Sequence, residues 1–200
     1  MAWPLHDLEL TTPDLVLRVM TEADALALGE LVPEDVTHDP TLPGLGHRVE
    51  QTYWRHMGQW RPDDWVLPFA VVRDGSLVGV QALEGKDFSV RRVVDSYSWL
   101  VTAARGQGVG KQMRVAVLEL GFRGLGAEYA ISEAYADNAA SLGVSRALGY
   151  VENGFAIERR DDGSGPVRME HLLLAAADWR PPWPVQISGL EPCLALFGVG

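Results

Sequence analysis

The chain is poor in the features that mark secreted and membrane proteins. Cys193 is its only cysteine among 200 residues, so no disulfide can form within the chain, and a reducing compartment fits. No apolar run approaches the roughly 20 residues that span a bilayer, and no basic segment followed by an apolar core stands at the N-terminus. We therefore expect a cytoplasmic protein without a membrane partner.

Basic residues are also scarce. Lys and Arg number 17 against 27 Asp and Glu, and the formal net charge is −10. This balance disfavours non-specific binding to nucleic acid and favours attraction of a cationic substrate, although an acidic surface also serves solubility alone. Charged residues make up only 22% of the chain, too few for a disordered protein, and the hydrophobic fraction of 47% suits a single globular domain.

The glycine-rich stretch at residues 105–110 is the most informative part of the sequence. The β-branched, aromatic and apolar residues of 93–101 predict a strand before it, and the apolar spacing of 111–122 predicts a helix after it. A glycine-rich turn at a helix N-terminus presents free backbone N–H groups to phosphate oxygens, and Arg114 adds positive charge. The predicted phosphate-binding residues are Arg105, Gly106, Gln107, Gly108, Val109, Gly110 and Lys111.

The spacing of the glycines narrows the choice of phosphate ligand. A dinucleotide fingerprint would need a third glycine where Lys111 stands, and an ATP-type loop would need Ser or Thr where Gln112 stands. The pattern that remains, Arg-x-x-Gly-x-Gly, resembles the pyrophosphate loop of the GCN5-related N-acetyltransferases (GNAT), which bind acyl-coenzyme A. The alternative is a glycine-rich turn without a ligand.

A second motif follows the first. Residues 128–135 predict another strand, and Asn138 and Gly149 suit the two ends of a helix. Asn138, Ser141, Gly149 and Tyr150 fit a second GNAT pattern, Asn-x-x-Ala/Ser, seven residues, then Gly-Phe/Tyr.

With serine in place of alanine at position 141, the motif resembles that of the RimJ/RimL-type ribosomal-protein N-terminal acetyltransferases. The opening strand and helix of residues 12–25 are similar to the same branch, and the resemblance covers roughly residues 11–179. It implies an α/β (α+β) fold with a mixed, mostly antiparallel, V-splayed sheet flanked by helices. Acyl-CoA would enter where strand 93–101 separates from strand 128–135, with no metal. Pantetheine would be held by Leu100, Val101, Asn138 and Ser141.

The remaining elements are read from local patterns. Thr21 is a good N-cap for a helix to Leu31, residues 33–47 suit a loop, and Asp74-Gly75 is a strong hairpin turn. Further predicted elements are strand 15–19, helix 48–60, the hairpin strands 68–73 and 77–83, and a last hairpin of 151–159 and 167–174.

A proline-rich break near residue 180 divides the chain. We expect residues 1–179 to form the acyltransferase domain. The apolar extension 180–200 should pack either on that domain or on a second subunit of a homodimer.

The resemblance also suggests catalytic groups. Glu133, five residues before Asn138, matches the place of a glutamate base in some N-terminal acetyltransferases, although it is equally a solvent-facing strand residue. The usual tyrosine acid falls on Ser145, a poorer acid, so Ser141 or water is an alternative donor. Asn138 is a candidate for the catalytic centre or the pantetheine contact, and otherwise a plain N-cap.

The amine acceptor should meet residues 33–47 and the helix after them. Asp35 and Trp54 are the main candidates, with Asp39, Glu50 and Trp60 beside them, although tryptophans are more often core residues. The sequence thus predicts an N-acetyltransferase that acts on a primary amine, such as a protein N-terminus, an antibiotic or another small amine. The alternatives are a noncatalytic acyl-CoA-binding module and an enzyme that transfers a longer acyl group to a peptide natural product.

Overall fold

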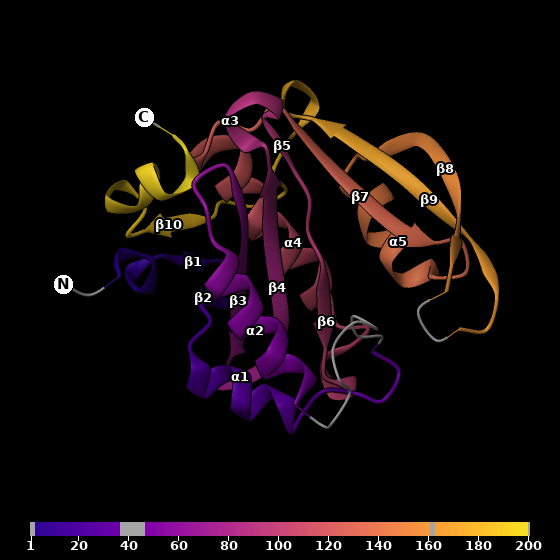
Figure 1. Cartoon of the computed structure of the whole chain (residues 1–200), viewed down its shortest axis with the longest axis horizontal. Helices are drawn as coiled ribbons and strands as arrows, with labels where there is room; N and C mark the ends of the chain where they lie inside the picture. The colour runs from indigo at the N-terminus through magenta and orange to yellow at the C-terminus, as the bar shows by residue number, and fades with distance from the viewer. Residues whose placement is uncertain (1–2, 37–46, 161–162, 200) are drawn as a thin grey trace.

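The computed structural model describes residues 3–36, 47–160 and 163–199 (Figure 1). The strands are β1 (Glu9–Thr11), β2 (Val16–Val19), β3 (Asp64–Arg73), β4 (Ser76–Lys86), β5 (Val93–Val94), β6 (Ser98–Leu100), β7 (Tyr129–Tyr135), β8 (Val151–Arg159), β9 (Pro166–Ala175) and β10 (Gln186–Ser188). The α-helices are α1 (Glu22–Gly29), α2 (Arg48–Gln59), α3 (Phe88–Arg91), α4 (Val109–Glu119) and α5 (Ala139–Ala147). Short helical turns are η1 (Pro4–Asp7), η2 (Thr102–Ala104), η3 (Leu120–Gly124), η4 (Ala176–Asp178) and η5 (Glu191–Phe197).

The strands form two sheets. The larger has the order β10-β1-β2-β3-β4-β6, and the smaller has the order β5-β7-β9-β8. All pairs are antiparallel except β5 with β7. The mixed, mostly antiparallel sheet expected from the sequence is therefore confirmed.

The V-shaped splay arises where the predicted strand 93–101 divides. Its first part, β5, pairs with β7 through Val93 and Tyr129, whereas its second part, β6, pairs with β4. An isolated bridge between Glu84 and Asp95 lies at the division. Beyond it, β6 and β7 belong to different sheets and diverge, as Figure 1 shows.

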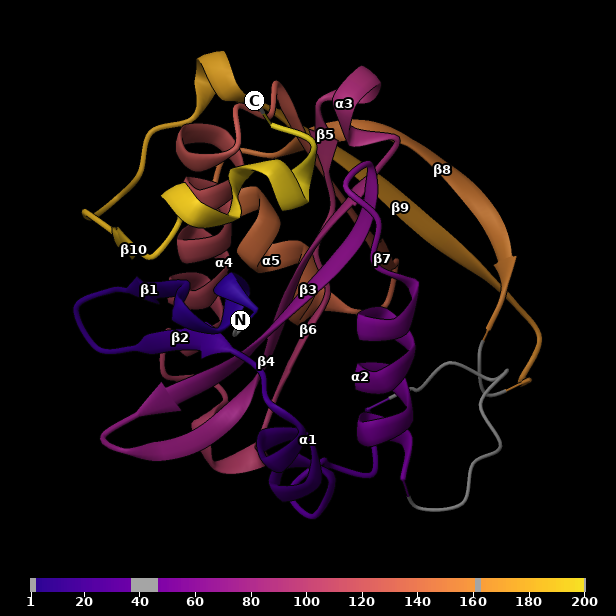
Figure 2. The same ribbon diagram turned by 60° about the vertical axis from the view of Figure 1, so that its left-hand side comes forward.

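Helices cover both faces of the larger sheet. On one face, α1 and α2 pack on β3 and β4 through Ala25, Leu28, Val49, Ala70 and Val80. On the opposite face, α4 contributes to the main core with Leu67, Phe69 and Leu83 of the same two strands. Figure 2 shows α2 and α4 on opposite sides of these strands.

Local signals predicted the helices and turns well. Thr21 and Asp24 form a capping box at the start of α1, and Asn138 accepts a hydrogen bond from the Ser141 N–H at the start of α5. The turn residues Asp74 and Gly75 both have positive φ, as a two-residue hairpin turn requires. The sequence did not reveal β1, α3 or β10, and α4 begins two residues earlier than predicted.

The last segment of the chain packs against the first. β10 pairs with β1, and Val185, Cys193 and Phe197 are buried. The Trp60 indole N–H donates to the Leu196 carbonyl at 3.0 Å. The apolar residues of the extension thus contact the core of their own domain. The domain boundary after residue 179 and any contact with a second subunit stay predictions.

No helix in the described ranges is long and apolar enough to cross a membrane. Across the same residues, no group of three or more His, Cys, Asp or Glu side chains is arranged to hold a metal ion.

Candidate active site

The glycine-rich loop forms the N-terminus of α4. Gly106 and Gly108 have φ of 73° and 80°, a left-handed conformation that glycine adopts without strain. The N–H groups of Lys111 and Gln112 both donate to the Gly108 carbonyl. Among the described residues, the backbone N–H groups of 106–110 have no backbone acceptor. They stand at the positive end of α4 and are suited to bind an anion.

Arg105 lies at this loop, but its guanidinium is hydrogen-bonded to a carboxylate of the protein itself, that of Asp35. Its Nη1 and Nη2 donate to the two oxygens of Asp35 at 2.6 and 2.9 Å. Its Nε donates to the Leu100 carbonyl at 3.1 Å. The hydrogen bond from Arg105 lowers the pKa of Asp35. The structure thus places Asp35 beside the glycine-rich loop, and this placement does not support its predicted contact with the amine.

Three other predicted residues near the loop have partners on the protein. The Gln107 side chain donates to the Ala103 carbonyl and accepts from Arg73. The Lys111 ammonium lies 6.0 Å from the centre of the Trp183 ring. Arg114 was expected to add charge beside the loop, and this is wrong. Its side chain is buried, and Nη1 lies 3.4 Å from the Ser132 hydroxyl, on the side of α4 that faces the sheets.

The edge of β6 supplies backbone groups to the gap between the two sheets. The Val101 N–H donates to the Val78 carbonyl, and the Tyr97 carbonyl accepts from Ala82. Backbone groups alternate in direction along a strand, so Ser98 and Leu100 direct theirs away from β4 and toward the gap. Leu100 therefore fits the predicted pantetheine contact. A free N–H at Val101 was expected, and this is wrong because Val78 already binds it.

Of the predicted site residues at α5, Asn138 caps the helix and Ser145 is directed into the protein interior. The Asn138 side chain acts as the N-cap and accepts from the Ser141 N–H at 3.1 Å. Ser145 is fully buried, with its hydroxyl 3.0 Å from that of Ser132. Ser132 also contacts Arg114, so Ser145 belongs to a buried polar network. This placement gives no support to Ser145 as the proton donor.

Glu133 lies on the other face of β7. Its neighbours Ser132 and Ala134 are buried on the side of α5, while Glu133 is exposed because side chains alternate along a strand. Its Oε1 lies 3.7 Å from Nε2 of His171 on β9. Glu133 is therefore accessible to a substrate from the face opposite α5.

Two carboxyl groups that the sequence analysis overlooked lie near Glu133. Glu84 and Asp95 are partners in the bridge at the division of the sheets. Burial, and next the charge of Asp95, raises the pKa of Glu84 to about 7. Burial raises the pKa of Asp95 to about 6, although the Ser96 N–H donates to its carboxylate at 2.7 Å. Glu133 acts electrostatically on both groups. For Glu84, the signal in the sequence was a charged residue directly after the predicted strand 77–83.

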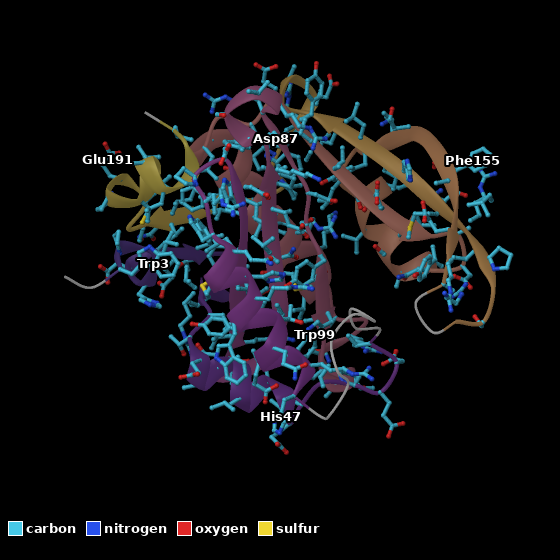
Figure 3. The ribbon with its side chains drawn as sticks, viewed as in Figure 1. Trp3, His47, Asp87, Trp99, Phe155 and Glu191 are labelled. Carbon is cyan, nitrogen blue, oxygen red and sulfur yellow. The ribbon has the colours of Figure 1, made fainter. Side chains whose placement is uncertain are left out.

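A pocket opens beside these carboxyls, between α2 and the strands β4 and β6. The Tyr97 hydroxyl lies 3.5 Å from Nδ1 of His56 at the wall of the pocket. Trp99 of β6, labelled in Figure 3, also lines the pocket. The indole N–H of Trp54 donates to Glu22 of α1, so this predicted substrate residue is turned away from the pocket. The lining residues are Met20, Val49, Thr52, Tyr53, His56, Pro68, Val80, Tyr97 and Trp99. Asp39, another predicted acceptor residue, lies outside the described residues.

Solved structures with the same fold include several acetyltransferases. RimL, described as a ribosomal L7/L12 alpha-N-protein acetyltransferase, is 17% identical with a TM-score of 0.68 over 84% of this chain and 94% of its own. A chimera of the spermidine N-acetyltransferase SpeG from Vibrio cholerae and hSSAT is 16% identical with a TM-score of 0.69, over 82% and 96%. A GNAT-family acetyltransferase from Bacillus anthracis is 14% identical with a TM-score of 0.69, over 84% and 99%. At these identities the likeness shows the fold.

The sequence itself shows the family. Residues 14–151 match the family described as acetyltransferase (GNAT) domain, and this span is more than half of the chain. It contains the splayed strands, the loop at the start of α4 and the capped helix α5, the three features that the sequence motifs predicted. The chain therefore belongs to the GNAT acetyltransferases.

Proposed function

We propose that the protein transfers an acetyl group from acetyl-CoA to a primary amine. The observation that carries the proposal is the alignment of an anion site with a gap between strands. Within the described part of the chain, the N–H groups of residues 106–110 have no backbone acceptor and stand at the start of α4, and the strand before them directs backbone groups of Leu100 into the gap between β6 and β7. Carboxyl groups lie at the division of the sheets, where the amine would approach.

Each part of the site has a role in this reaction. The loop and Arg105 hold the pyrophosphate, and the backbone of Leu100 holds pantetheine. Acetyl-CoA supplies the thioester carbonyl. The backbone N–H groups that β6 directs into the gap are suited to stabilise the oxygen that becomes negative when the amine attacks.

Glu133 is our candidate base, directly or through water. An ammonium group must lose a proton before its nitrogen can attack, and the exposed carboxylate of Glu133 can accept it. The new C–N bond forms, the C–S bond breaks, and the departing thiolate takes up a proton. Because Ser145 is buried, we favour water over Ser145 for that last transfer, with Ser141 as the protein alternative.

The class of acceptor rests on chemistry. The net charge of −10 and the carboxyls beside the gap attract a cationic amine. RimL acts on a protein α-amine and SpeG is named for spermidine, and both acceptors are amines. The RimJ/RimL-type motifs make a protein N-terminus one candidate, beside a small amine or an antibiotic. A cytoplasmic location and a homodimer complete the proposal.

Two measurements test the proposed function. Calorimetry should show CoA binding, and release of free thiol from acetyl-CoA should depend on an added amine. Binding without thiol release from any amine would favour the noncatalytic module. Thiol release from longer acyl-CoA in preference to acetyl-CoA would favour the alternative acyl donor. Absence of CoA binding would refute the assignment.

A further inference from the structure

The pocket between α2 and the larger sheet is mostly apolar. Its walls carry Met20 and Pro68 at one side, Val49 and Tyr53 of α2 at another, and Val80 on its floor. Trp99 of β6 and Tyr97, which directly precedes that strand, add aromatic surface. The polar side-chain groups among the lining residues are the Thr52 hydroxyl, the His56 imidazole, the tyrosine hydroxyls and the Trp99 indole N–H; the rest of the lining is mostly apolar, so the pocket suits an apolar group.

One end of this pocket runs toward the half-buried carboxyls of Glu84 and Asp95. Along β4 and β6, Val80 is opposite Trp99, Ala82 is bonded to Tyr97, and Glu84 is opposite Asp95. Successive pairs of this kind are two residues apart, or about 7 Å, and their side chains lie on the same face. The carboxyl pair therefore stands about 7 Å beyond Tyr97, at the end where the sheets divide.

Around Glu84 and Asp95, carboxyl groups outnumber arginines, so the site favours binding of a further positive charge. Glu133 adds a third carboxylate from the smaller sheet, with His171 beside it. Arg55 of α2 acts on Glu84, and Arg114 of α4 acts on Asp95. Three carboxyls are thus accompanied by two arginines, both of which have other interactions. A substrate ammonium would relieve the repulsion between Glu84 and Asp95.

We propose that the acceptor is a primary amine joined to an apolar or aromatic group, with the ammonium held by Glu84 and Asp95 and the apolar group held in the pocket between α2 and β6. The inference rests on the proposed acetyl transfer and names its substrate class. A polyamine would place a second cation among Val80, Tyr53 and Met20, where it would lose its hydration without a partner. An acceptor of this class includes an N-terminal residue with an apolar side chain.

Matched amines and two variants test the inference. The amines are phenethylamine and isopentylamine, compared with putrescine and ethanolamine. Thr52→Phe should fill the pocket from α2, and Gln59→Phe is the control because Gln59 is on the same helix but outside the pocket. We expect Thr52→Phe to lower kcat/KM for phenethylamine about tenfold or more, the scale expected for excluding a buried ring. Gln59→Phe should leave it unchanged.

CoA affinity serves as the check of folding, since the loop at α4 is remote from Thr52 in the sequence and on the opposite face of the sheet. Trp99→Leu, from the opposite wall, should weaken phenethylamine turnover even where Thr52→Phe fails to fold. Putrescine or ethanolamine turned over as well as phenethylamine would overturn the inference. So would equal turnover of phenethylamine by wild type, Thr52→Phe and Trp99→Leu.

Failure of the proposed function gives a different result. If no amine releases thiol, binding of phenethylamine to the CoA-saturated protein is measured by calorimetry. Phenethylamine binding that is lost in Thr52→Phe and kept in Gln59→Phe would support the assignment of the pocket and would refute only the proposed catalysis. Absence of phenethylamine binding to that complex would refute the pocket assignment.

Discussion

The ion pair between Arg105 and Asp35 predicts that substitutions of its two partners change CoA affinity in opposite directions. Arg105 is predicted to hold the pyrophosphate, yet both of its terminal nitrogens donate to Asp35. A phosphate oxygen must therefore compete with the carboxylate for the same donors. Arg105→Ala should weaken CoA binding, and Asp35→Asn, which removes the competing charge, should tighten it.

The magnitudes follow from exposure and charge. Loss of a charged hydrogen-bond donor to a phosphate costs about 1.5–3 kcal/mol, so Arg105→Ala should weaken binding roughly ten- to a hundredfold. The Asp35 side chain is 67% exposed, so water screens the pair. Exposed pairs are weak, and releasing Arg105 should tighten CoA binding only about two- to fivefold.

Calorimetric titration with CoA measures both effects. Asp14→Asn is the matched control, because Asp14 accepts a hydrogen bond from Gln112 near the same helix end but does not contact Arg105. It should change CoA affinity less than Asp35→Asn does. The competition is refuted if Asp35→Asn weakens CoA binding as Arg105→Ala does, since Asp35 would then support the loop.

Other predictions concern the carboxyls and the C-terminal segment. The pKa of Glu84 is raised from 4.5 to about 7, so the folded protein holds its proton longer and loses stability as pH rises through this interval. Glu84→Gln should therefore raise Tm relative to wild type at about pH 8 more than at about pH 5, and Glu158→Gln, at an exposed position of β8, is the control. Glu133→Gln should lower kcat/KM for the amine about 10²–10⁴-fold, less at high pH, and a wild-type rate from about pH 6 to 9 would exclude it as the base. Phe197→Ala should cost about 3–5 kcal/mol in urea unfolding, because Phe197 is fully buried, and an unchanged midpoint would contradict its place in the core.

Short-range signals explain what the sequence predicted of this fold. The capped helices, the Asp74-Gly75 turn and the glycine loop each depend on a few neighbouring residues, and all were found. The division of strand 93–101 depends instead on pairing with β4 and β7, which are distant in sequence. β1 and β10 have three residues each, too few to show a period.

The same distinction holds for the candidate site. The anion loop was predicted because its chemistry lies in consecutive residues. Glu84 and Asp95 became neighbours only through strand register, which no local pattern gives. Arg114 was misplaced because a charged residue in a helix gives no sign of the face it occupies, and here that face is buried. The pairing of Asp35 with Arg105 was missed because the two residues are 70 positions apart in the sequence.

The packing of the C-terminal segment also gives the protein an optical signal. Trp60 and Trp65 stack with ring centres 6.1 Å apart, and Phe197 meets their rings at 5.4 and 4.9 Å. Rigid aromatic surroundings generate the near-ultraviolet circular dichroism that is lost when tertiary packing loosens. A variant such as Phe197→Ala, which removes one ring of this cluster, should therefore reduce the signal in the unlabelled protein.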